Sequence, residues 1–198
     1  MTSGSGHGNG TATSIRQVLM DEHRLIEQVL DAIDGMLIEG SFDAGFLTGA
    51  LDFLRNFADG CHHEKEEQHL FPALELAGVP RVGGPIDCML QDHDEGRGLL
   101  RVVESNLAAA GRGENPARTA VCSALRRYVE MLRRHIEKED NILFVIAENM
   151  LPPDRRSRML KDFERQESSP AQIERREHYV NLARTLNHWK FGRTTVDA

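Results

Sequence analysis

Six side chains with metal-binding chemistry recur along the chain at spacings that suit helix faces. Four are histidines on separate segments, and two are glutamates that follow a histidine by four positions: His23, His62, Glu66, His93, His135 and Glu139. Residues i and i+4 lie on one face of a helix, so each His-x-x-x-Glu pair can reach the same ion. Imidazole and carboxylate donors without a thiolate suit iron, manganese or zinc.

The two glutamates need compensating positive charge if they face a core. A buried carboxylate without a partner costs several kcal/mol, and no Lys or Arg falls on the apolar faces that carry Glu66 and Glu139. A metal centre supplies that charge, and two carboxylates can bridge two ions. Six protein donors are too many for one four-coordinate zinc and too few to saturate two six-coordinate ions. Positions therefore remain for a solvent-derived bridge and for a small exogenous ligand.

Each of these signals has a simpler explanation when it stands alone. A single His-x-x-x-Glu is most often a surface ion pair, and a lone core histidine is more often hydrogen-bonded than metal-bound. Here the simpler explanation would have to hold six times, at corresponding positions on inward-facing stripes. The pattern therefore favours a metal centre.

Four long helices are predicted to position these residues, over about 15–39, 43–77, 85–110 and 116–150. Their apolar residues recur every three or four positions, and the candidate ligands fall on the same stripes. Segments rich in Gly and Pro separate them. Two charged helical stretches, about 154–167 and 170–190, follow. The pattern predicts an all-α, antiparallel up-and-down four-helix bundle with a C-terminal helical extension.

The composition of successive segments divides the chain into three parts, and the composition as a whole disfavours some classes of function. Residues 1–14 are mostly Gly, Ser, Thr and Asn and predict a flexible tail, residues 15–150 the bundle, and residues 151–198 the extension. The net charge of −7 disfavours nucleic acid as a partner. No apolar run reaches the roughly 20 residues of a membrane span. Three cysteines without metal-type spacing favour a reducing, cytoplasmic compartment. A monomer or weak dimer is expected.

An internal repeat relates the two halves of the predicted bundle. Residues 62–71 and 135–144 are identical at six of ten positions, and the flanks of His23 and His93 agree in character. The first two helices therefore resemble the last two. A two-fold arrangement of the halves would bring two single histidines and two His-x-x-x-Glu units to one centre.

The order and spacing of these six residues resemble the hemerythrin-like, HHE cation-binding domains. The resemblance covers about residues 15–150, and residues 62–72 and 91–95 look very much like the second and third metal segments of that family. It implies a centre of two non-heme iron ions with an oxo or hydroxo bridge. It also implies that Glu66 and Glu139 bridge the irons and that His23, His62, His93 and His135 are terminal ligands.

The chain departs from the oxygen-carrying members of that family. Those proteins use five histidines, two of them as His-x-x-x-His on the third helix, and an aspartate on the fourth. Here Arg97 stands four positions after His93, and Glu139 stands in place of the aspartate. The chain looks more like the four-His, two-Glu subgroup, which is linked to iron–sulfur repair under nitrosative stress and to peroxide or nitric oxide chemistry.

Two functions from different classes follow from the resemblance. The first is a di-iron redox protein that reacts with O2, H2O2 or nitric oxide, with a catalase- or peroxidase-like detoxifying role and an electron donor that the sequence does not name. The second is a non-catalytic protein that binds iron, oxygen or nitric oxide as a sensor, store or carrier. A stable reversible adduct would favour the second, and turnover of peroxide the first.

Four further residues are candidates for roles near the centre. Gly96 follows His93 by three positions on the third stripe, where a missing side chain could leave space for a small ligand. Either Tyr179 or His178 is expected to cap the open end of the bundle near the metal, and Tyr179 is the one candidate catalytic residue. His69 could contact a ligand. Three histidines are expected to have no metal role: His7, His63 and His188. Of these, His63 is expected to be solvated.

Overall fold

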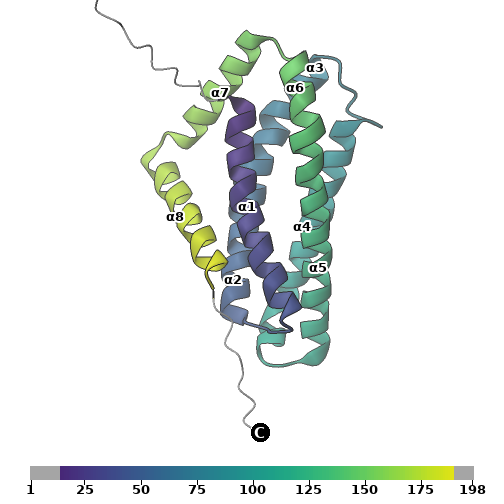
Figure 1. Ribbon diagram of the computed structural model, residues 1–198, viewed down its shortest axis with the longest axis vertical. Coiled ribbons are helices and arrows are strands. Elements are labelled where there is room, and N and C mark those ends of the chain that lie inside the picture. The colour runs from purple at the N-terminus through teal and green to yellow at the C-terminus, as the bar shows by residue number, and fades with distance from the viewer. Residues whose placement is uncertain (1–13, 190–198) are drawn as a thin grey trace, which may run out of the picture.

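The computed structural model describes residues 14–189, so most of the predicted tail, His7 with it, and the last nine residues of the predicted extension lie outside the described residues. Within residues 14–189 all regular secondary structure is helical. Four long helical runs pack side by side and alternate in direction (Figure 1). The predicted all-α bundle is therefore confirmed.

The four runs begin and end close to the predicted positions. The first run is α1 (Ile15–Ile38) and the third is α4 (Pro85–Gly111). The second consists of α2 (Ala44–Phe53), the π-helical segments η1 (Leu54–His63) and η2 (Glu66–Leu70), and α3 (Phe71–Leu76). The fourth consists of α5 (Asn115–Lys138), the π-helical segment η3 (Glu139–Leu143), and α6 (Phe144–Met150).

Short polar side chains start the first two runs. The Ser14 hydroxyl accepts a hydrogen bond from the Gln17 amide at 3.1 Å, and Asp43 accepts one from the Phe46 amide at 2.9 Å. Each cap pairs an amide that the first helical turn leaves without a partner. These caps mark where α1 and α2 begin.

Three π-helical segments interrupt the second and fourth runs, where the sequence predicts uninterrupted α-helix. Segment η1 ends at His62 and His63, η2 begins at Glu66, and η3 begins at Glu139. A π-turn closes its hydrogen bond one residue later than an α-turn, and such turns occur often at functional sites. The wider turns change the direction in which the candidate ligands point. Apolar spacings of three and four residues predict only α-helix and so do not predict this change.

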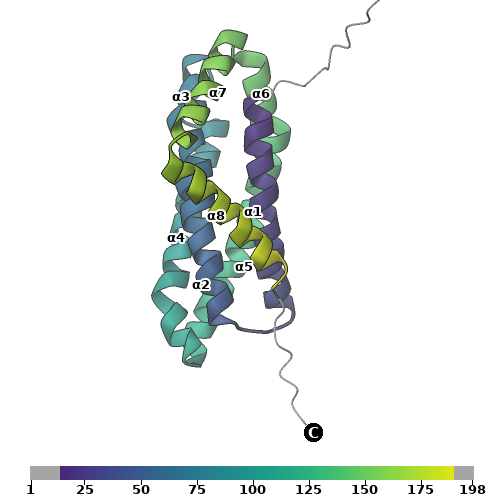
Figure 2. The same cartoon turned by 90° about the vertical axis from the view of Figure 1, so that its left-hand side faces the viewer.

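The predicted C-terminal extension is confirmed as a pair of helices, α7 (Pro153–Glu167) and α8 (Pro170–Asn187). Helix α7 folds back from the end of α6, and α8 then runs diagonally across the face formed by α1 and α2 (Figure 2). Apolar side chains attach both helices, with Phe163 of α7 and Leu186 of α8 each 2% exposed. The extension therefore packs on the half of the bundle that carries His23 and His62.

Two apolar clusters fill the bundle, and the candidate ligands lie between them. Along α1 the smaller cluster ends at Leu19 and the larger begins at Ile26, on either side of His23. Along α4 the same boundary falls between Met89 and Leu100, around His93. Within residues 14–189, no helix has the length and apolar character needed to cross a bilayer.

Candidate metal centre

All six predicted ligands converge in one buried layer, each with 2% of its surface exposed or less. Donor atoms of His23, His62, Glu66 and Glu139 lie within 4.8 Å of one another. A second group, also within 4.8 Å, contains Glu66 again, together with His63, His93 and His135. The structure thus places two donor groups next to each other with one carboxylate in common.

Both glutamates span between histidines from different helical runs. Glu66 Oε1 lies 3.7 Å from His62 Nε2, and Glu66 Oε2 lies 3.6 Å from His93 Nε2. Glu139 Oε2 lies 3.2 Å from both His23 Nε2 and His135 Nε2. Each carboxylate therefore lies between histidines of two helical runs, and Glu66 belongs to both donor groups.

The layer gathers buried polar atoms that lack hydrogen-bond partners. Of the eight such side-chain atoms within residues 14–189, seven belong to five side chains here: His23, His62, His63, Glu66 and Glu139. Folded proteins pair nearly all buried polar atoms, so a concentration of unpaired nitrogens and carboxylate oxygens calls for a common partner. Both atom types are lone-pair donors, so the residues present fit a metal ion at this layer.

In each predicted histidine ligand, a carboxylate contacts the ring nitrogen Nδ1 and orients the ring. The Nδ1 atoms lie 2.7–3.2 Å from carboxylate oxygens, in the pairs His23–Asp140, His62–Glu22, His93–Glu67 and His135–Asp92. An ionised carboxylate only accepts hydrogen bonds, so it fixes the proton on Nδ1 and leaves the Nε2 lone pair free for a metal. Sequence reasoning missed these four carboxylates.

The internal repeat accounts for this arrangement. Glu22 and Asp92 each precede a histidine by one position, and Glu67 and Asp140 each follow a glutamate ligand by one position. Lysines at equivalent positions of the repeat hold two of the carboxylates, in the pairs Lys65–Glu22 and Lys138–Asp92. Arginines hold the others, in the pairs Arg97–Glu67 and Arg24–Asp140. The repeated segments therefore encode the outer contacts as well as the ligands.

Lys65 is the buried cation that sequence analysis did not anticipate. Its side chain is fully buried and ion-pairs with Glu22 and with Glu167 at the end of α7. Arg176 of α8 reaches the same Glu22 carboxylate at 3.0 Å. These cations neutralise Glu22 and Glu167, and no ion pair joins either of them to Glu66 or Glu139 in the described part of the chain. The charge of the two central carboxylates still requires a separate partner.

Burial and mutual repulsion set the proton affinities of the layer. Burial, reinforced by the nearby charge of Glu139, raises the pKa of Glu66 well above its ordinary value. Burial lowers the pKa of His62 to about 4 and that of His93 to about 3. For His135, burial is outweighed by the charge of Glu139 and the hydrogen bond to Asp92, which raise its pKa to about 9. Without a cation, the layer therefore retains protons that a metal ion would displace.

The prediction that His63 is solvated is wrong. Its side chain is 5% exposed, and its ring stacks on that of His93 with 3.9 Å between centroids. The reason is the π-helical geometry of η1, which turns two consecutive residues, His62 and His63, toward the layer. An α-helical period places only one residue of such a pair on the stripe.

The described contacts of Tyr179, His178 and His69 lie outside the ligand layer. The Tyr179 ring lies 6.2 Å from that of Phe53 and 6.1 Å from that of Phe57, within the larger apolar cluster. A role for Tyr179 at the metal stays a prediction. His178 is exposed at the surface, 3.9 Å from Asp52, so the expectation that it caps the centre is wrong. His69 packs against Phe163 of α7 instead of a ligand.

Gly96 does not leave open space beside the centre. A Cβ atom at this position would lie 3.1 Å from Met131 Cε and 3.4 Å from Tyr128 Cε2. These two buried side chains already fill the volume that the missing side chain provides. The expectation of a ligand space at Gly96 is therefore wrong, and the glycine lets α4 approach Tyr128 and Met131 closely.

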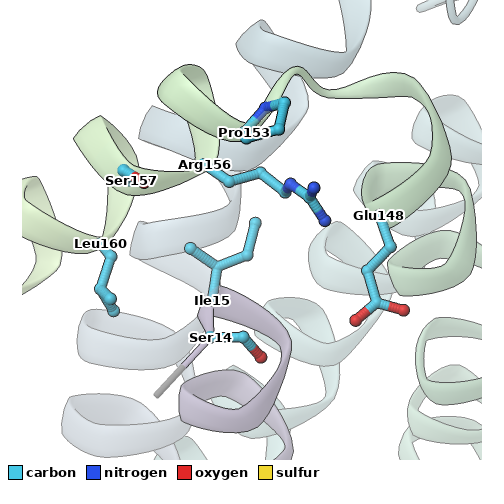
Figure 3. Close-up of a pocket in the computed structure, with 7 residues that line it drawn as sticks. All are labelled: Ser14, Ile15, Glu148, Pro153, Arg156, Ser157 and Leu160. Carbon is cyan, nitrogen blue, oxygen red and sulfur yellow. The ribbon is translucent and has the colours of Figure 1, made fainter. Parts of the chain in front are cut away.

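A surface hollow of about 210 Å³ lies at the end of the bundle, away from the ligand layer. Figure 3 shows it between the start of α1, the last turn of α6 and α7, with Arg156 reaching across toward Glu148. Glu148 itself pairs with Arg16 at 2.9 Å. None of the six predicted ligands lines this hollow.

Comparison with known proteins agrees with this geometry. The family model of the hemerythrin HHE cation binding domain matches residues 14–147. An uncharacterized protein of Mycobacterium tuberculosis is 26% identical over 153 residues, which are 75% of this chain and 59% of the relative. The iron-sulfur cluster repair protein YtfE of Escherichia coli O157:H7 is 33% identical over 85 residues, which are 42% of this chain and 39% of the relative. A YtfE of Dickeya chrysanthemi is 32% identical over a segment of the same length.

The matched part of the chain spans 59% of the length of the mycobacterial relative and 39% of that of the Escherichia coli relative. No solved structure gives a significant match. The family match covers all six predicted ligands and the bundle that carries them, from the cap of α1 to α6. Together with two donor groups that share a buried glutamate, it shows that this chain belongs to the hemerythrin HHE cation-binding domain family and carries that family's metal-binding bundle.

Proposed function

We propose that this chain holds two non-heme iron ions and reacts with O2, H2O2 or nitric oxide in protection against oxidative or nitrosative stress. The observation that carries the proposal is the pair of donor groups joined by Glu66, with Glu139 spanning the same gap. Imidazole and carboxylate donors that leave coordination positions vacant suit iron that must also bind an exogenous ligand. The name of the YtfE relatives, iron-sulfur cluster repair protein, supports a stress role.

Burial of the layer restricts what can react there. All six predicted ligands are almost fully buried, and aromatic rings cover two of the histidines, with Phe144 stacked on His23 and Phe71 on His93. These phenylalanines occupy equivalent positions of the repeat. A layer enclosed between two apolar clusters excludes bulk water and large substrates, so it suits a diatomic gas or peroxide.

The protein's own groups would orient and balance the centre. The four carboxylates on the Nδ1 atoms orient the imidazoles, and these imidazoles together with Glu66 and Glu139 would hold the iron ions. In the metal-free layer Glu66, whose pKa is raised, holds a proton that a bound metal ion would displace. When bound, the iron pair would supply the exchange of electrons with the small ligand.

The test is metal analysis of the purified protein, followed by optical spectra of the ferrous form exposed to O2, nitric oxide and peroxide. We expect two irons per chain, an oxo-to-iron absorption band, and turnover of peroxide. His62→Ala should lose iron, whereas His188→Ala, at an exposed position on the extension, should keep it. Fewer than two irons per chain after reconstitution with excess iron would contradict the proposal.

The same experiment separates catalysis from binding. Turnover of peroxide with retention of both irons assigns a catalase- or peroxidase-like enzyme. A stable adduct that forms and releases the ligand without turnover assigns the second candidate function, a non-catalytic binder of oxygen or nitric oxide.

A further inference from the structure

His63 faces the ligand layer and, like the four predicted histidine ligands, has a carboxylate at its Nδ1 atom. Its Nδ1 atom lies 3.3 Å from Asp59 Oδ1, and its buried Nε2 atom has no hydrogen-bond partner. Arg97 in turn donates to Asp59 from Nε at 2.9 Å and also contacts Glu67, which orients His93. A carboxylate thus fixes the proton of His63 on Nδ1 and leaves Nε2 available as a donor.

The distances place His63 with one of the two donor groups. Its donor nitrogen lies within 4.8 Å of donor atoms of Glu66, His93 and His135. Donors on opposite sides of one ion, with bonds of about 2.1 Å, are about 4.2 Å apart. The four donor atoms are therefore already held close to the spacing of ligands on a common ion.

A purely structural role accounts for these contacts less well. A histidine that only stacks on His93 and pairs with Asp59 would leave Nε2 buried and unpaired, whether that atom is protonated or not. Folded proteins avoid such atoms unless another group satisfies them. Coordination uses the Nε2 lone pair and keeps the Asp59 contact.

The internal repeat is broken at this position. The residue equivalent to His63 in the second repeat is Ile136, which is 3% exposed and packs in the larger apolar cluster. The two donor groups therefore differ in their number of imidazoles. One group contains the nitrogens of His63, His93 and His135, and the other those of His23 and His62.

We propose that His63 is a fifth imidazole ligand, on the same ion as His93 and His135. This inference rests on the proposed two-metal centre. The oxygen-carrying members of the family have their additional histidine at the position of Arg97 on α4. In this chain the second helical run would supply the fifth nitrogen instead, from His63. The inference also means that the ion held by His23 and His62 has two imidazole ligands where the other has three, so a small exogenous ligand binds there.

The test counts coordinated imidazoles without reference to activity. In protein loaded with Co²⁺, each coordinated imidazole gives a strongly shifted, exchangeable proton NMR signal from its Nδ1–H. We expect five such signals in the wild-type protein and four in His63→Gln, whose side-chain amide can still donate to Asp59. His69→Ala, a matched change seven positions past His62, should keep all five, because His69 contacts Phe163.

Metal affinity and chemical rescue supply two further measurements. His63→Gln should weaken the binding of one of the two metal ions by at least about tenfold. In His63→Ala, added free imidazole should restore the fifth nitrogen donor and the lost affinity, which a folding defect would not allow. Circular dichroism checks that each variant keeps the helical fold.

The outcomes separate the two proposals. Two Co²⁺ ions per chain with four shifted signals in both wild type and His63→Gln would overturn the role of His63 and leave the two-metal centre intact. Fewer than two ions per wild-type chain, even with excess metal, would overturn the proposed function itself. Loss of one signal in His63→Gln alone, with imidazole rescue of His63→Ala, supports the inference.

Discussion

Glu22 and His62 form a buried hydrogen bond between α1 and the second helical run, with 3.0 Å between Glu22 Oε2 and His62 Nδ1. The same carboxylate pairs with the fully buried Lys65 and with Arg176 of α8. One side chain therefore joins a predicted metal ligand, a buried cation and the C-terminal extension. Its counterpart in the repeat, Asp92, orients His135 at 3.2 Å and pairs with Lys138, but is partly exposed.

Replacing either carboxylate by its amide should weaken metal binding to a similar degree. Glu22→Gln and Asp92→Asn both weaken the acceptor on a histidine Nδ1, and loss of such contacts costs about 10–100-fold in metal affinity. Their effects on the metal-free protein should differ. Glu22→Gln leaves Lys65 with less compensation in the interior and should lower the free energy of unfolding by about 3 kcal/mol.

For Asp92→Asn, solvent screens the partly exposed Lys138, so the free energy of unfolding should fall by no more than about 1 kcal/mol. Metal titration and urea unfolding of the metal-free proteins measure both quantities. Equal losses of unfolding free energy in the two variants would contradict the assignment of Glu22 as the interior partner of Lys65.

Acid should weaken the fold partly through Glu22. Burial alone would raise its pKa, but the hydrogen bond to His62 and the charge of Lys65 outweigh burial and lower the pKa to about 2, from an unfolded value of 4.5. A carboxyl with a lowered pKa stabilises the fold above its unfolded pKa and loses that contribution as pH falls toward its folded pKa. The difference in free energy of unfolding between the wild type and Glu22→Gln should therefore be constant above about pH 4.5.

That difference should then shrink steadily between about pH 4.5 and 2. Urea unfolding of both metal-free proteins across this range measures it. A difference that stays unchanged down to pH 2 would show that Glu22 is not held ionised by His62 and Lys65.

Metal binding should release protons at neutral pH. In the absence of metal, Glu66 has a raised pKa because of burial and Glu139, and the pKa of His135 is raised to about 9. A bound metal requires the carboxylate and the neutral imidazole, so both groups must give up their protons. An indicator dye in weakly buffered solution should report more than one proton per chain.

Glu66→Gln has no carboxyl proton to release and should give about one proton fewer per chain, provided that it still binds metal. Because metal and protons compete for the same atoms, metal affinity of the wild type should fall as pH decreases. Identical proton release from the wild type and Glu66→Gln would place the retained proton elsewhere.

The extension should influence metal binding through Arg176. Its guanidinium contacts Glu22 at 3.0 Å and also Glu167, so it helps hold the carboxylate that orients His62. Arg176→Met removes these contacts and should lower metal affinity severalfold while the helical content is kept. Arg184→Met, at an exposed position two turns further along α8, is the matched control and should leave affinity unchanged. Equal affinities for the two variants would show that α8 only packs on the bundle.

Much of this protein could be predicted from its sequence because helices have a fixed period. That period predicts the four runs, the breaks between them and the extension, and it places His23, His62, Glu66, His93, His135 and Glu139 on inward faces. The structure brings those six side chains together in one buried layer. Local spacing was sufficient because each ligand lies on a stripe whose neighbours are apolar.

Only the tertiary structure decided which residues surround the ligands. The partners of the Nδ1 atoms lie 26 to 117 positions away along the chain, and nothing in local spacing pairs Glu22 with His62 or Asp140 with His23. The burial of Lys65 depends on Glu167 of α7, which the fold brings beside Glu22. The prediction that His63 is solvated is wrong because it rests on an α-helical period, from which the π-helical turns of η1 depart. The sequence by itself determined the helix faces, while long-range packing and the local change of helix type decided the contacts that tune the centre.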